Sequence, residues 1–183
     1  MSTPTNSADS VELIDTLLDQ AKTASGGRLL ALHHDLARSP AVLAAYMGLR
    51  HAGADYGTFD PALRAAVMLT VGAVDGGDYS QAIATQLALV SGMSIEQTVA
   101  VRTGQADDAR TAALLAVTRE AAANAGLVSD DTWAAALGAG WRDEQLVEAF
   151  AYVALTVFVD YFTNYARTRL DVPPAPPIPG GGE

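Results

Sequence analysis

A polar turn interrupts an otherwise apolar helical stretch between residues 72 and 92, which reads GAVDGGDYSQAIATQLALVSG. The turn contains Asp75, Asp78 and Tyr79. Two carboxylates and a phenol could perform acid–base chemistry or hold a cation. They are equally typical of a glycine-rich turn, because an Asp side chain readily bonds nearby backbone N–H groups. Both interpretations stay open for these three residues.

Ser80 follows this turn and offers a hydroxyl as a possible nucleophile. A serine is a weak nucleophile unless a base lies within hydrogen-bond distance, and the neighbouring sequence supplies none. Ser is also one of the residues preferred as the cap of a helix N-terminus. We therefore favour a capping or merely polar role for Ser80.

The chain has three histidines, His33, His34 and His51. Adjacent residues on a helix point about 100° apart, so His33 and His34 are not expected to bind one metal together. The sequence contains no glycine-rich phosphate loop, no zinc-ligand spacing and no Ser-His-Asp arrangement. We expect neither a metal nor another cofactor.

The overall composition excludes several classes of protein. The 183 residues carry a net charge of −10 with a pI near 4.5, so nucleic acids and anionic membranes are unfavourable partners. The N-terminus shows no targeting signal and no stretch approaches about 20 uninterrupted apolar residues, so we expect a cytoplasmic protein. The chain contains no cysteine, which removes every mechanism that uses a sulfur nucleophile.

Helix signals fill the chain, and no segment alternates like a strand, so we expect an all-α, single-domain bundle. The domain spans residues 10–173, between termini (1–9 and 174–183) that we expect to be disordered because of their polar or Pro/Gly-rich composition. Asp60-Pro61 and the Ser94/Gln97 capping box mark two helix starts. A first helix ends at Gly26-Gly27, one begins after Ser94, and the others cover residues 29–37, 40–51, 62–75, 79–90, 108–125, 129–137 and 143–170.

The longest predicted helix carries an apolar stripe that we expect to be buried. Asn164 lies beside this stripe and needs a partner there, for which we favour a subunit contact over a ligand. The low charge density and the many Ala, Leu and Val residues favour a homo-oligomer over a monomer. The stripe consists of Leu146, Phe150, Val153, Val157, Phe158, Tyr161, Phe162 and Tyr165.

Three short motifs give the sequence a family resemblance. They are the Gly76-x-x-Tyr79 turn, the Gly92-x-Ser94 junction and the segment FTNY at residues 162–165 that leads to LDVP. With their surroundings, from about Leu29 to Pro173, they resemble the carboxymuconolactone decarboxylase family, whose best-known redox branch is the alkylhydroperoxidase AhpD group. The resemblance implies a compact helical bundle that assembles into trimers or hexamers.

The resemblance also implies a redox site that this chain has lost. Redox members place a Glu before a Cys-x-x-Cys turn and a His one helical turn beyond it, so that thiols react with peroxide while Glu and His move protons. These positions correspond to Ala65 for the Glu, Gly77 and Ser80 for the two cysteines and Ala84 for the His. The resemblance also places His33 and His34 near the mouth of the pocket.

Three functions remain in competition. We favour a redox-inactive member that binds a small organic molecule in an apolar pocket, with Arg64, Tyr79, Ser80 and Ala84 as candidates for contacts with the ligand. The second is a non-redox enzyme of decarboxylase, lactone-processing or isomerase type, using Asp78, Tyr79, Ser80, His33 or His34, with Arg64 as a possible carboxylate anchor. The third is an assembly partner without a ligand.

Overall fold

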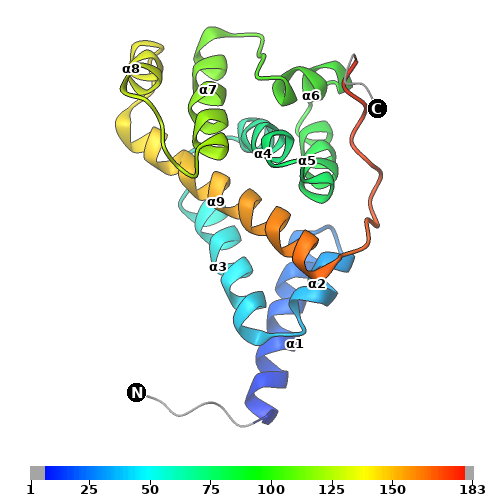
Figure 1. Cartoon of the computed structure of the whole chain (residues 1–183). Helices are drawn as coiled ribbons and strands as arrows, with labels where there is room; N and C mark the ends of the chain where they lie inside the picture. Colours follow the sequence, from blue (N-terminus) through cyan, green and yellow to red (C-terminus); the bar gives the residue numbers. More distant parts are fainter. Residues whose placement is uncertain (1–6, 180–183) are drawn as a thin grey trace.

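The computed structural model describes residues 7–179, and within them it contains α-helices and no strand, as the sequence predicts. Figure 1 shows the helices as two groups on either side of the long helix α9. The helices are α1 (Ser7–Ala24), α2 (Ala31–Leu36), α3 (Pro40–Asp55), α4 (Pro61–Asp75), α5 (Asp78–Val90), α6 (Ile95–Arg102), α7 (Ala109–Ala123), α8 (Asp130–Gly138) and α9 (Asp143–Ala166).

The predicted helix starts are confirmed by their capping bonds. Asp60 accepts a hydrogen bond from the Leu63 N–H at 2.8 Å, and Ser94 and Gln97 form the reciprocal bonds of a capping box. Helix α9 ends four residues earlier than predicted, because Arg167 adopts a left-handed conformation with φ 56°. This conformation stops the α-helix and lets the next N–H bond back into its last turn.

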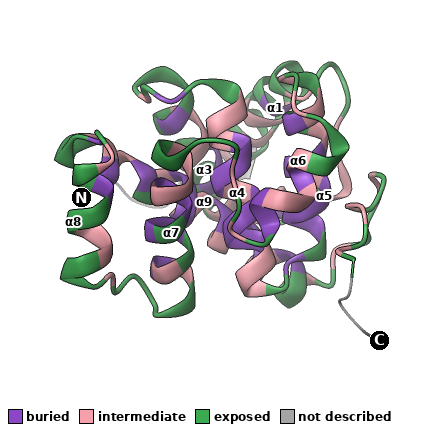
Figure 2. Ribbon diagram, turned by 90° about the horizontal axis from the view of Figure 1, so that it is seen from above, coloured by how far each residue is buried: buried purple, intermediate pink, exposed green. Residues whose placement is uncertain are grey.

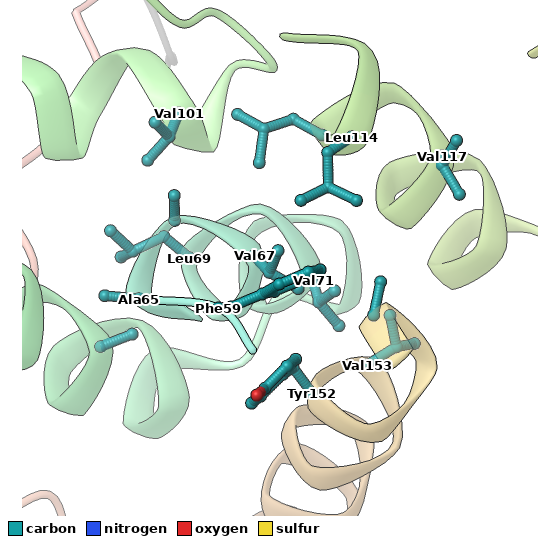
Figure 3. Packing of buried hydrophobic residues seen from close by; sticks show 14 of the residues in the cluster. Phe59, Ala65, Val67, Leu69, Val71, Val101, Leu114, Val117, Tyr152 and Val153 are labelled. Atoms are coloured by element: carbon teal, nitrogen blue, oxygen red, sulfur yellow. The ribbon is translucent and has the colours of Figure 1, made fainter. Parts of the chain in front are cut away.

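Two apolar clusters form the core. The larger one surrounds α4, which packs against α5, α6, α7 and α9. Figure 3 shows Phe59 and Tyr152 of this cluster face to face, and their ring centroids lie 5.4 Å apart. The smaller cluster joins α1, α2 and α3 to one face of α5 and α9, with Leu32, Leu36 and Leu43 fully buried. Figure 2 shows buried residues concentrated on α4, α5 and α9.

Helix α9 is only partly buried. Leu146 and Val153 lie in the core as predicted, but Phe150, Tyr161 and Tyr165 are exposed by 58%, 67% and 89%. The prediction was wrong for these three because both faces of the helix are apolar, so periodicity alone does not identify the buried one. Asn164 is also exposed.

By length and composition alone, α9 could cross a membrane. Half of its most apolar window is buried inside the bundle, as is typical of the central helix of a soluble domain. The cytoplasmic location stays a prediction.

The two ends of the chain extend the predicted domain. Residues 7–9, expected to be disordered, belong to α1, and residues 1–6 lie outside the described part. Residues 174–179 follow an extended path after α9, and residues 180–183 lie outside the described part. Figure 1 shows this extended segment passing α5 toward α6.

Candidate functional site

The four positions that the resemblance assigns to a redox site come together where α4 packs against α5. Ala65 lies on α4, Gly77 directly precedes α5, and Ser80 and Ala84 lie on α5. All four are buried, and Ala65 and Ala84 belong to the large apolar cluster. Their methyl groups fill the core, so neither position contributes a polar group.

The turn between α4 and α5 places Ser80 inside the protein. Gly76 ends α4 in a left-handed conformation with φ 69°, and Gly77 is the N-terminal cap residue of α5. Ser80 therefore does not cap the helix as predicted. It lies in the first turn with 1% exposure, and its hydroxyl donates to the Gly77 carbonyl at 3.1 Å.

An aspartate from α9 lies against this turn. Asp160 is 1% exposed, and neither of its carboxyl oxygens has a hydrogen-bond partner among the described residues. A Cβ added at Gly77 would overlap the Asp160 carboxyl group. The carboxyl group thus lies where a side chain at Gly77 would begin, which is the position that the resemblance gives to the first thiol.

The surroundings of Asp160 keep its carboxyl group protonated to an unusually high pH. The pKa of Asp160 is raised from 3.8 to about 7, mainly by burial and also by the negative charges of Asp75 and Asp78, while the nearby hydroxyl and backbone N–H of Ser80 act in the opposite direction. A group with such a pKa can give or take a proton at neutral pH. Ser80 is not arranged as a nucleophile, because its hydrogen is donated to the Gly77 carbonyl.

Sequence reasoning missed Asp160, which lies 80 positions after Ser80. The available signal was its isolation, because Asp160 is the only charged residue between Ala149 and Ala166. A lone acid in a long apolar helix is rarely buried without a functional reason or a partner. Only the packing of α9 on α5 shows which turn it reaches.

Among the described residues, neither Asp75 nor Asp78 is hydrogen-bonded to Tyr79. Asp78 is exposed, whereas Asp75 is half-buried, and burial raises the pKa of Asp75. One carboxyl oxygen of Asp75 has no hydrogen-bond partner within residues 7–179. The Tyr79 hydroxyl donates to Asp171 at 2.8 Å and accepts from the Leu32 N–H at 3.2 Å. Its phenol therefore belongs to a separate hydrogen-bonded cluster.

Asp171 is the centre of this second cluster. Besides the Tyr79 hydroxyl, its carboxylate accepts from the Ala31 N–H and from the Arg28 guanidinium, both at 3.0 Å. These bonds lower the pKa of Asp171 although burial acts in the opposite direction. Through these hydrogen bonds, Asp171 holds the beginning of the segment that follows α9 against α2 and α5.

The two predicted histidines have different environments. His33 is 1% exposed, its Nδ1 accepts from the Leu30 N–H at 3.0 Å, and its Nε2 has no partner among the described residues. Burial and the nearby Arg50 lower the pKa of His33 to about 4, so the ring is neutral at pH 7. His34 is exposed and lines a surface hollow of about 520 Å³ beside the end of α9.

Arg64 connects helices. Its Nε donates to the Phe59 carbonyl at 2.8 Å and one terminal nitrogen donates to the Gly53 carbonyl at 3.4 Å. A second hollow, of about 290 Å³, lies between α4, α6 and α7, and none of Arg64, Tyr79, Ser80 and Ala84 lines either hollow. No group of three or more His, Asp or Glu side chains in the described part of the chain could hold a metal ion.

Comparison with known proteins supports the fold. The model of the carboxymuconolactone decarboxylase family matches residues 40–123. A structure of a variant of the debrominase Bmp8 in complex with 2,3,4-tribromopyrrole has a TM-score of 0.74 at 15% identity over 93% of both chains. The apo form of Bmp8 gives a TM-score of 0.73 at 14% identity, over 92% of this chain and 91% of that one. No curated protein sequence matches the chain.

Proposed function

Since the chain belongs to the carboxymuconolactone decarboxylase family and contains no cysteine, we propose that it binds a small organic molecule beside the N-terminus of α5, without thiol chemistry. The observation that supports this site is the buried carboxyl group of Asp160, which lies between α9 and the Gly77 turn and has no hydrogen-bond partner in the described part of the chain. A buried carboxyl group without a partner is costly, and such groups cluster at functional sites. A ligand with a hydrogen-bond donor or acceptor would supply the missing partner.

A direct binding experiment tests this site. The probe is 2,3,4-tribromopyrrole, because the similar fold of Bmp8 holds it and its N–H can donate to a carboxylate. We expect saturable binding by calorimetry, and at least about tenfold weaker binding to Asp160→Asn, the equivalent of one lost charge-assisted hydrogen bond. Asp15→Asn, which changes an exposed acid on α1, is the matched control.

Two outcomes contradict the proposal. If the probe does not bind and native mass spectrometry of the purified protein shows no small molecule, the third function, an assembly partner without a ligand, is favoured. The full burial of Val71 and Ala84 in the core is consistent with that function. Peroxide consumption with a dithiol reductant above the buffer rate would contradict the absence of thiol chemistry.

Proton transfer is the second candidate function, and the position of Asp160 favours it. A carboxyl group with a pKa of about 7 can act as a general acid or base on a small ring compound. Asp160 is better placed than Asp78, which is exposed, or Tyr79, whose hydroxyl is occupied. We expect the protein to accelerate exchange of the ring C–H of tribromopyrrole in D2O, measured by NMR, and Asp160→Asn to abolish the acceleration.

We further propose that the chain forms a homo-oligomer, a trimer or hexamer, through the exposed side of α9. Val147, Phe150, Tyr161 and Tyr165 form an apolar stripe along this helix at helical spacing. An exposed stripe of this length is typical of a protein contact rather than of a free surface. The exposed Asn164 lies beside it and would find its partner there.

A further inference from the structure

The extended segment after α9 is held to the bundle at few points. Asp171 fastens its start, and further along the Arg102 guanidinium donates to the Pro176 carbonyl. Residues 173–179 contain five prolines, which have no N–H to donate. Ala175, Pro176 and Ile178 are half-buried, and the prolines between and around them are exposed. This segment, residues 173–179, is called the C-terminal strap below.

Arg102 is a buried cation that forms no salt bridge among the described residues. It is 9% exposed, and its Nε donates to Gln81 Oε1 at 2.8 Å. Burial lowers the pKa of Arg102 and the negative charge of Asp78 raises it, and an arginine stays charged at every physiological pH. Burying an unpaired charge is unfavourable, and the neutral carbonyl of Pro176 compensates it only partly.

Gln81 connects Arg102 to the Asp160 site. Its amide nitrogen donates to the Gly77 carbonyl at 3.2 Å, and the Ser80 hydroxyl donates to the same oxygen. Asp160 lies against Gly77. The turn at Gly77 is therefore in contact with the buried carboxyl group of Asp160, and Gln81 connects the same turn to the buried guanidinium of Arg102. The guanidinium is planar and matches the two oxygens of a carboxylate.

We propose that Arg102 binds the carboxylate of a small organic ligand and that the C-terminal strap is a displaceable latch whose Pro176 carbonyl occupies this position when no ligand is bound. The inference rests on the proposed function, because it extends the Asp160 site. A carboxylate is the stronger acceptor for a guanidinium, so it displaces the neutral carbonyl. The prolines make release easy, because few backbone bonds hold the strap.

NMR of the 183-residue chain can follow the strap directly. The chain has four isoleucines, and Ile178 lies in the strap, whereas Ile14, Ile83 and Ile95 lie in α1, α5 and α6. The δ1-methyl NMR signals of these isoleucines can be recorded during a titration with benzoate. The Ile178 signal then reports whether the strap is displaced, and the signals of the isoleucines in the helices are internal controls. We expect the Ile178 signal to move saturably to the position of a solvent-exposed methyl while the Ile14 signal stays.

Three variants test the assignment. Arg102→Lys is expected to weaken benzoate binding at least about tenfold, since it loses the bidentate contact, while Arg110→Lys, which changes an exposed arginine, has no effect. If Arg102→Lys does not fold, Pro176→Gly/Pro177→Gly replaces it as the test. These glycines make the strap more flexible when released, so benzoate should bind more tightly.

Each contrary result has a defined meaning. A static Ile178 signal at saturating benzoate, or equal benzoate affinity in Arg102→Lys, overturns the latch. Equal displacement by inorganic phosphate overturns the carboxylate assignment. If tribromopyrrole binds in an Asp160-dependent way while the latch fails, the proposed function stands alone. If neither probe binds and native mass spectrometry shows no small molecule, both proposals fail.

Discussion

The carboxyl group of Asp160 on α9 lies in the space that a side chain at Gly77 would need. Gly77 has a φ of −79°, which any residue adopts, so the backbone conformation does not require a glycine here. Glycine is required because a larger side chain would overlap the Asp160 carboxyl group. The two residues therefore belong together, although 83 positions separate them. The relationship also means that a cysteine at position 77 is incompatible with Asp160 in its present place.

The first prediction concerns this pair. Gly77→Ala is expected to lower the free energy of unfolding by about 1–3 kcal/mol, because its methyl group overlaps a buried carboxyl group. In the background of Asp160→Ala the same change should cost less than about 0.5 kcal/mol, because the space is then free. Urea denaturation of the four proteins measures the coupling.

The control for this cycle is Gly48→Ala. Gly48 lies exposed on α3, and a Cβ there meets nothing within 4 Å. Alanine favours helix more than glycine does, so this change should be neutral or stabilise by up to about 1 kcal/mol. A Gly77→Ala protein that is equally stable with and without Asp160 would contradict the overlap.

The second prediction follows from the pKa of Asp160. The folded-state pKa of about 7 lies above the unfolded value of 3.8, so the folded state keeps a proton that the unfolded state loses. The contribution of Asp160 to the free energy of unfolding therefore falls as the pH rises from about 4 to 7. We expect Asp160→Asn to reduce the difference in unfolding free energy between pH 5 and pH 8 by about 3 kcal/mol.

Chemical denaturation of wild type and variant at both pH values measures this difference. Asp15→Asn, which changes an exposed acid on α1, serves as the control and should leave the difference as in wild type. A wild-type-like pH dependence in Asp160→Asn would mean that Asp160 is ionised throughout this range.

The third prediction concerns the acid side of the stability curve. His33 has a pKa of about 4 in the folded protein against 6.5 in the unfolded chain, so the unfolded state binds a proton first. The contribution of His33 to the free energy of unfolding is then lost as the pH falls from about 6.5 to 4, by about 3 kcal/mol in total. His33→Leu should remove this loss, whereas the exposed His34→Gln should keep it. An NMR titration in which the His33 ring protonates near pH 6.5 would refute the assignment.

Much of the fold could be predicted from local signals. Asp60, Ser94 and Gln97 mark helix starts because a cap acts within four residues of its partner. The site could not be predicted in the same way. Asp160 reaches Gly77 only through the packing of α9 on α5, and Ser80 resembles a cap until its burial is known. These relations depend on tertiary contacts, which neither periodicity nor turn chemistry contains.

The last prediction concerns the exposed side of α9 and the proposed oligomer. Tyr161 and Tyr165 are 67% and 89% exposed and follow Phe150 along the same stripe. Tyr161→Lys/Tyr165→Lys would bury two cations in a contact through this face, so the variant should be monomeric by light scattering while the wild type is not. Tyr56→Lys is the control, because Tyr56 is 85% exposed but follows α3. A monomeric wild type would exclude the oligomer, and an unchanged mass of the double variant would assign the contact to another surface.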